Sequence, residues 1–278
     1  MHTMTLGYSP CPNDTHIFYA LKHGLIDGGG LHFKERLEDV ETLNQLALNG
    51  LFDISKVSYH AVGFIRDEYC VLRSGGALGR GCGPLVVTRE YDSMAALKGK
   101  KVALPGCFTT ASLLFQLYGA EAGEVVFLPF NEIMEAVRSG EADAGVIIHE
   151  SRFTFASYGL SSILDLGDWW EMETGYPIPL GCIVARRSLG ASTLKLLDRI
   201  VRDSVVYSNT HPDEALGYIC KYAQEMSVEV CKAHIQLYVN DFTIDLGREG
   251  EAAVTALLAR AEERGLTPKA IKNIFNYQ

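Results

Sequence analysis

The chain has 278 residues, a length that allows one large or two medium-sized domains. Apolar residues make up 47% and charged residues 21%, so the chain can bury a sizeable core and carries no compositional sign of disorder. The net charge of −9 and the lack of a Lys/Arg cluster argue against nucleic acid as a partner.

Targeting signals and metal motifs are also missing from the sequence. The opening stretch MHTMTLGYSPCPND has no charged region followed by an apolar one, and no apolar run approaches 18 residues, so we expect a cytoplasmic protein without a membrane partner. Seven cysteines without a C-x-x-C pair predict reduced thiols. Cys231 and His234 have helical spacing, but two ligands do not complete a zinc shell, so we predict no metal site.

In chain order, short β-type runs alternate with helical segments. The first series predicts strands and helices in turn over 5–9, 14–23, 31–36, 41–49, 53–58 and 59–66. A glycine-rich stretch, SGGALGRGCG (74–83), then predicts a crossing between lobes. The second series continues over 84–89, 101–105, 110–118, 125–129, 132–139, 144–148 and a helix to about 158. A return strand and four helices are predicted over 181–187, 192–208, 212–223, 227–238 and 249–264.

This alternation predicts an α/β fold of two lobes, each a mostly parallel sheet flanked by helices. The last helices have only the first lobe left to cover. We therefore expect a larger discontinuous lobe, 1–88 plus 181–278, and a smaller inserted lobe, 89–180. Two lobes joined by two crossings predict a hinge with a cleft between the lobes.

Ligands in open α/β sheets bind beyond the carboxyl ends of strands, so residues that follow each predicted strand are candidates for the site. Asn13 and Asp14 follow the first strand in SPCPNDTH, where either can also simply cap the next helix. In SKVSYH, Lys56, Ser58 and His60 share one face of an extended segment. The alternative reading of this lysine is protection of an edge strand against aggregation.

Two further strand exits lie in the second series. In LPGCFTTAS, Thr109 or Thr110 caps a helix whose free amides can bind a carboxylate or phosphate, although a plain cap explains the threonines too. His149 leaves the apolar run AGVII; it is either a hydrogen-bonded core residue or a general base. Glu150 or Ser151 can cap the helix that follows, so the cap does not require His149.

Two other stretches have less specific readings. SGGALGRGCGP matches neither the P-loop nor the dinucleotide-binding glycine pattern, which favours a hinge. EDVET (38–42) is explained by helix capping.

Six of these motifs, in this order, resemble the 1,4-dihydroxy-6-naphthoate synthases of the futalosine route to menaquinone: SPCPNDTHIFYAL, LEDVETLN, SKVSYHA, RSGGALGRGCGPLVV, GCFTTAS and IIHESRFTFASYGL. The resemblance covers nearly the whole chain and is less distinctive after about residue 240. It implies a type II periplasmic-binding-protein-like fold, used by a cytoplasmic lyase without metal or redox cofactor. The implied substrate is a small-molecule carboxylate, cyclic dehypoxanthinyl futalosine, which loses its sugar-derived fragment as dihydroxyacetone.

Carried over to matching positions, the resemblance implies that His149 in IIHES accepts the proton. It also implies that Lys56, Val57 and Ser58, and Thr109 with Thr110, contact the substrate. These positions do not depart from the family pattern, whereas Cys107 and Phe108 beside the threonines are positions that can vary.

Alternative functions remain open on the sequence alone. The chorismate-dehydrating enzyme of the same pathway shares fold and pathway, whereas a solute-binding protein shares the fold but needs no base. A regulatory module would need a DNA-binding domain, which the sequence does not predict. The sequence is compatible with either a monomer or a homodimer.

Overall fold

The computed structural model describes residues 3–223 and 227–275, and the chain divides into two compact units. Unit 1 contains residues 1–79 and 179–278, and unit 2 contains residues 80–178. The first division lies within the glycine-rich stretch. It precedes the boundary that we expected after residue 88, because β6 (Leu85–Thr88) pairs with two strands of unit 2.

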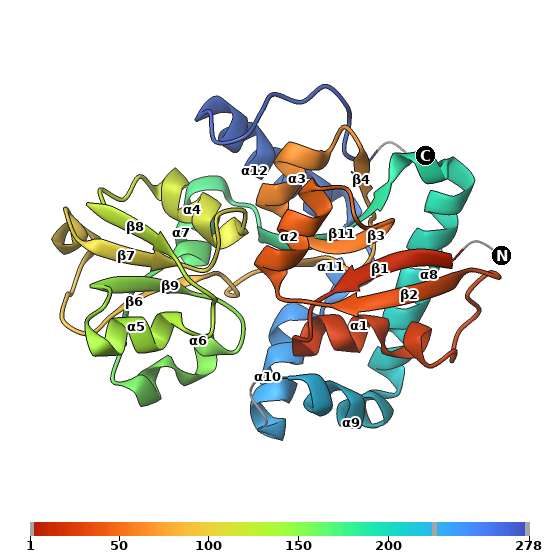
Figure 1. Cartoon of the computed structure of the whole chain (residues 1–278), viewed down its shortest axis with the longest axis horizontal. Helices are drawn as coiled ribbons and strands as arrows, with labels where there is room; N and C mark the ends of the chain where they lie inside the picture. Colours follow the sequence, from red (N-terminus) through yellow and green to blue (C-terminus); the bar gives the residue numbers. More distant parts are fainter. Residues whose placement is uncertain (1–2, 224–226, 276–278) are drawn as a thin grey trace. The chain divides into compact units, whose positions relative to one another are not determined.

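Unit 1 is built on a six-stranded mixed sheet (Figure 1). Its strand order is β2-β1-β3-β11-β4, with β5 paired to β11. The strands β1, β2 and β3 run parallel, whereas β11 is antiparallel to β3 and β4. The strands of this sheet are β1 (Thr3–Tyr8), β2 (His32–Leu37), β3 (Ile54–Ser58), β4 (Tyr69–Val71), β5 (Ala77–Gly79) and β11 (Ile178–Arg186).

Helices cover both faces of this sheet. They are α1 (Pro12–Lys22), α2 (Val40–Leu48), α3 (Tyr59–Ile65), α8 (Ala191–Thr210), α9 (Pro212–Tyr222), α10 (Val228–Tyr238), α11 (Asp241–Ile244) and α12 (Gly247–Glu263), with a 3-10 turn at Arg187–Leu189. Apolar residues of α1 and α8, such as Phe18 and Leu197, form one core with Leu6 and Ile54 of the strands. On the side of α2, Gly7 allows close packing, because a Cβ there would lie 2.8 Å from the Phe52 ring.

Unit 2 contains a five-stranded mixed sheet in the order β10-β6-β9-β7-β8. Besides β6, its strands are β7 (Lys101–Leu104), β8 (Glu124–Phe127), β9 (Ala144–Ile147) and β10 (Ser161–Asp165). Its helices are α4 (Thr110–Tyr118), α5 (Ile133–Ser139), α6 (Ser151–Thr154) and α7 (Leu166–Thr174), with 3-10 turns at Met94–Leu97 and Phe155–Tyr158. Figure 1 shows α4 and α7 on one side of this sheet and α5 on the other.

The packing of α5 explains part of the composition of β9. Ile133 and Val137 of α5 belong to the same core as Ala103 and Ile147 of the strands. At Gly145 a Cβ would lie 2.4 Å from Ile133, so a larger residue would push the helix away from the sheet.

The predicted α/β fold class is confirmed, and the predicted strands and long helices occur within about three residues of their expected ends. The sheets are mixed rather than mostly parallel as predicted, because β11 runs antiparallel to β3 and β4, and β6 runs antiparallel to β9 and β10. The prediction missed β4 and β5, which have three residues each, and α11, which has four. Elements this short carry too few residues for a periodic pattern. It also missed β10 and α7, whose start is capped by Asp165.

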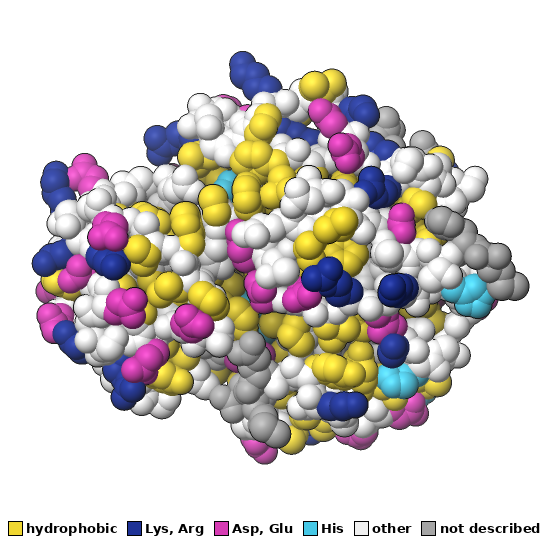
Figure 2. All heavy atoms as spheres, in the orientation of Figure 1, with side chains coloured by type: hydrophobic (Ala, Val, Ile, Leu, Met, Phe, Trp, Pro, Cys, Tyr) yellow, Lys and Arg dark blue, Asp and Glu magenta, His cyan; other side chains and the backbone are white. Residues whose placement is uncertain are grey.

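None of the helices in residues 3–223 and 227–275 combines the length and apolarity that a bilayer crossing requires. Cys70, Cys82, Cys182 and Cys220 are free thiols. On the face shown in Figure 2, acidic side chains are interspersed with basic ones.

Candidate functional site

In unit 1 the chain changes direction across the sheet between β1 and β3. It leaves β1 through α1 to reach β2 on one side, then returns through α2 to β3 on the other side of β1. Such a reversal of strand order opens a crevice at the carboxyl ends of the two central strands. Two of the predicted segments, 9–14 after β1 and 56–58 at the end of β3, lie at this edge of unit 1.

A buried ion pair joins these two segments. The Lys56 ammonium lies 2.7 Å from Oδ1 of Asp14, and the two side chains are 5% and 2% exposed. Asp14 also accepts hydrogen bonds from the Ser9 hydroxyl at 2.7 Å, the Ser9 amide at 3.2 Å and the Asn13 side-chain amide at 2.9 Å. Lys56 donates a second hydrogen bond to the carbonyl of Gly75 at 3.1 Å. An ammonium has three hydrogens, so the third can serve a bound ligand.

Ser58 ends β3 and pairs with Asn44 of α2. The Asn44 side chain accepts from the Ser58 amide at 2.8 Å and donates to the Ser58 hydroxyl at 3.1 Å. Because Ser58 Oγ accepts this bond, its own hydrogen can be donated elsewhere. Val57 is fully buried, and by strand alternation its side chain points away from the face that carries Lys56.

Two alternative readings and one expectation about unit 1 are corrected. Asn13 and Asp14 do not cap α1: both lie inside it, and Cys11 is the N-cap. Lys56 does not protect an edge strand, because β3 lies between β1 and β11. His60 does not extend the strand face of Lys56, because β3 ends at Ser58 and His60 belongs to α3.

Unit 2 repeats the same topological arrangement. The chain runs from β7 through α4 to β8, then returns through α5 to β9 on the other side of β7. Since β7 and β9 are parallel neighbours, with Val102 opposite Ala144, their carboxyl ends share one edge. The start of α4 and His149 follow these two ends directly, which is where a doubly wound sheet binds its ligand.

The start of α4 is a well-formed helix N-terminus. Thr109 is the N-cap: its hydroxyl oxygen accepts from the Ser112 amide at 3.2 Å, and its hydrogen points to the Gly106 carbonyl at 3.1 Å. Ser112 Oγ also donates to the Gly106 carbonyl. Thr109 and Thr110 are 2% and 3% exposed. Thr109 therefore caps α4, as one of the two readings predicted. The backbone amides of the first turn also make this end of the helix favourable for an anion.

His149 has an unusual backbone. Its φ of +57° makes it the single non-glycine residue in the left-handed region among residues 3–223 and 227–275. This conformation costs an L-residue about 1–2 kcal/mol, and such strain concentrates at functional sites. The imidazole packs edge-on against Phe130, which follows β8, with 4.9 Å between ring centroids. As a whole residue His149 is partly buried, and its Nε2 atom is shielded from solvent.

Sequence reasoning missed His234, which it considered only as a metal ligand. His234 is fully buried on α10, and its Nε2 lies 2.9 Å from Oδ1 of Asn13. The two residues are 221 positions apart in the sequence. Local spacing therefore contains no signal for this contact.

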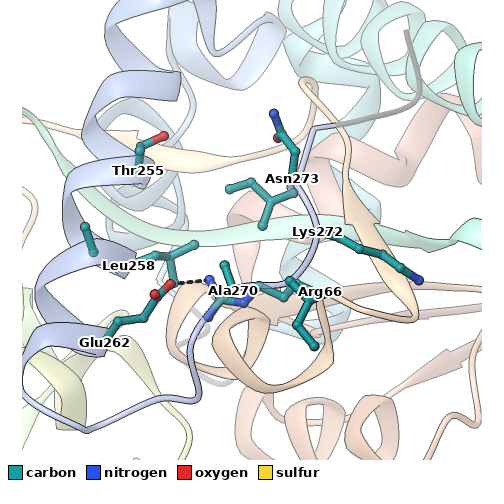
Figure 3. Close-up of a pocket in the computed structure, with 10 residues that line it drawn as sticks. Arg66, Thr255, Leu258, Glu262, Ala270, Lys272 and Asn273 are labelled. Atoms are coloured by element: carbon teal, nitrogen blue, oxygen red, sulfur yellow. Dashed lines mark hydrogen bonds and ion pairs between the residues drawn. The ribbon is translucent and has the colours of Figure 1, made fainter.

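A groove of about 400 Å³ lies elsewhere in unit 1, between α12 and the C-terminal segment (Figure 3). Its central charge is already neutralised, because Arg66 lies 2.7 Å from Glu262 and also donates to the Pro268 carbonyl. Apolar side chains such as Leu258 line the rest. The groove contains none of the predicted site residues, and Arg66 connects Glu262 of α12 with Pro268 of the C-terminal segment.

The fold and the strand-exit sites place the chain among proteins with the periplasmic-binding-protein fold. It is similar to the aliphatic sulphonate-binding protein of Escherichia coli, with a TM-score of 0.68, 13% identity, and coverage of 100% of this chain and 91% of that one. The alkanesulfonate-binding protein of Xanthomonas axonopodis gives a TM-score of 0.73 at 12% identity, covering 96% and 94%. These likenesses concern the fold alone.

Sequence similarity specifies the family. Residues 4–263 match the family described as menaquinone biosynthesis. The 1,4-dihydroxy-6-naphthoate synthase of Thermus thermophilus is 51% identical over 99% of this chain and 100% of its own, and that of Streptomyces coelicolor is 49% identical over 96% and 95%. A crystal structure of an Archaeoglobus fulgidus protein has a TM-score of 0.90 at 38% identity, covering 95% and 98%. The chain belongs to the 1,4-dihydroxy-6-naphthoate synthase family of menaquinone biosynthesis enzymes.

Proposed function

We propose that this protein is a carbon–carbon lyase that converts cyclic dehypoxanthinyl futalosine into 1,4-dihydroxy-6-naphthoate and dihydroxyacetone. The observation that carries the proposal is the identity of about half of the residues, over nearly the whole chain, with two synthases of that name. The motifs that carry the candidate site lie within the matched region.

In this proposal His149 is the general base. Its imidazole removes a proton from a hydroxyl group of the sugar-derived ring, and that oxygen becomes the carbonyl of dihydroxyacetone. The adjacent carbon–carbon bond breaks, and its electron pair passes into the conjugated ring, which becomes aromatic after protonation. A side chain with an ordinary pKa near neutrality suits this step, and its position after β9 supports the assignment.

Each unit has its own switch-point edge, and each edge favours its own kind of ligand group. The aromatic carboxylate would bind at the start of α4, where the amides around Thr109 and Thr110 favour an anion. Lys56 and Ser58 would bind hydroxyl or carbonyl oxygens, since each has a hydrogen left to donate. Because Asp14 already neutralises Lys56, this pair favours a neutral oxygen over a second carboxylate.

The test is turnover of the purified protein with cyclic dehypoxanthinyl futalosine, followed by mass spectrometry of both products. Chorismate is offered separately, and loss of water from it would instead identify a chorismate dehydratase. Product from neither substrate, with binding retained, would identify a solute-binding protein and refute the lyase.

The role of His149 is tested by His149→Ala and His149→Asn. Asparagine tolerates the left-handed backbone but cannot accept the proton, so it separates loss of the base from backbone strain. We expect both variants to lower kcat by about 100-fold or more while the protein stays folded. Near-normal turnover of either variant would remove the base assignment.

A further inference from the structure

We infer that His234 is a positioning residue that acts on Lys56 through Asn13 and Asp14. The inference rests on the proposed function of Lys56 as a substrate-binding residue. His234 does not itself need to touch the substrate. All four residues belong to unit 1.

The relay is continuous and buried. His234 Nε2 lies 2.9 Å from Asn13 Oδ1, Asn13 Nδ2 donates to Asp14 Oδ1 at 2.9 Å, and the same oxygen accepts from Lys56 at 2.7 Å. None of the four residues is more than 6% exposed. Hydrogen bonds that are shielded from water in this way are stronger, and their loss is not compensated by solvent.

The arrangement also fixes which atom donates at each step. A carboxylate only accepts, so Asn13 must present its NH₂ group to Asp14 and its carbonyl oxygen to His234. His234 must then carry a hydrogen on Nε2. The Asn13 amide is thus held at both ends, by Asp14 through its NH₂ group and by His234 through its oxygen, and without the Nε2 hydrogen Asp14 alone orients it.

A less firmly held amide would change the position of the lysine. Asp14 Oδ1 accepts from both Asn13 and Lys56, so movement of the Asn13 NH₂ group weakens the geometry that holds Lys56 at 2.7 Å. The Lys56 hydrogen that is left for the substrate has a fixed direction only while Asp14 and Gly75 hold the other two. His234 thus contributes to substrate affinity rather than to proton transfer.

Helix α1, which carries Asn13 and Asp14, offers a matched control. His16 is also a buried histidine of unit 1, and its Nε2 lies 2.8 Å from Oδ1 of Asn209 at the end of α8. No hydrogen bond connects that pair to Asp14 among the contacts of the described chain. His16→Met and His234→Met therefore remove equivalent contacts, only one of which leads to Lys56.

The experiment compares these two variants with wild type and with His234→Gln, whose amide nitrogen can replace Nε2. We expect His234→Met to raise KM about tenfold with kcat within about twofold, which corresponds to about 1.4 kcal/mol of binding. His234→Gln should restore most of the loss, and His16→Met should leave KM unchanged. Should His234→Met fail to fold, His234→Asn, whose amide is too short to reach Asn13, takes its place.

A second measurement needs no substrate. Acetic anhydride labelling, followed by mass spectrometry, should modify Lys56 about tenfold faster in His234→Met than in wild type or His16→Met. Equal labelling rates, or equal KM values for the two methionine variants, would overturn the inference. Lack of turnover by the wild type would instead refute the proposed function, and the labelling comparison would still decide the role of His234.

Discussion

Replacing Lys56 by methionine tests the buried ion pair most directly. The substitution keeps most of the side-chain volume but leaves the Asp14 carboxylate, 2% exposed, without its cation. Breaking a buried pair from one side costs about 3–5 kcal/mol. Asp14 retains three donors from Ser9 and Asn13, so we expect the lower end, about 3 kcal/mol, in the free energy of unfolding.

The measurement is urea unfolding followed by circular dichroism, with two comparison variants. Lys22→Met breaks an ion pair of similar length, 2.8 Å to Glu35, in the same unit, but Lys22 is 43% exposed, so the cost should stay below about 1 kcal/mol. The double variant Lys56→Met with Asp14→Asn removes both charges and should recover part of the loss. A cost below about 1 kcal/mol for Lys56→Met alone would refute the assignment of a buried, coupled pair.

Three further predictions concern other parts of the chain. Thr109→Val removes the cap of α4 and should cost about 1 kcal/mol in urea unfolding, whereas Thr109→Ser should cost less; equal costs would contradict the capping role. Burial lowers the pKa of His16, so the unfolded chain binds the proton more readily and stability should fall as pH drops below 6.5. His16→Gln should flatten that part of a stability profile, and an unchanged slope would exclude His16 as its cause. Burial raises the pKa of the Cys70 thiol to about 11, so iodoacetamide at pH 8 should label exposed Cys107 first by peptide mass spectrometry; faster labelling of Cys70 would contradict this.

The sequence was most informative where patterns are local. Apolar runs bounded by glycine, proline or capping residues predicted the long elements, and the strand-exit rule alone selects Lys56, Thr109 and His149 as candidates. The same rule made Asp14 a substrate-binding candidate, with helix capping as the alternative, but it did not predict the ion pair with Lys56, which lies 42 residues away.

Long-range pairing and backbone strain account for most of what was missed. His234 reaches Asn13 across 221 positions, a separation over which a single sequence shows no periodicity. The positive φ of His149 was likewise not predictable, because left-handed backbone is normally signalled by glycine or asparagine. Tertiary contacts, rather than local propensity, decide both features.

The left-handed backbone at position 149 restricts which other bases could evolve or be engineered there. Histidine, asparagine, aspartate and glycine are the residues that adopt this conformation most readily, and among them only histidine and aspartate can accept a proton. A lysine or glutamate at this position would cost about 1–2 kcal/mol in backbone strain. Aspartate is therefore the carboxylate residue that best fits the backbone of this turn. Because the ordinary pKa of aspartate is lower than that of histidine, it would suit more acidic conditions.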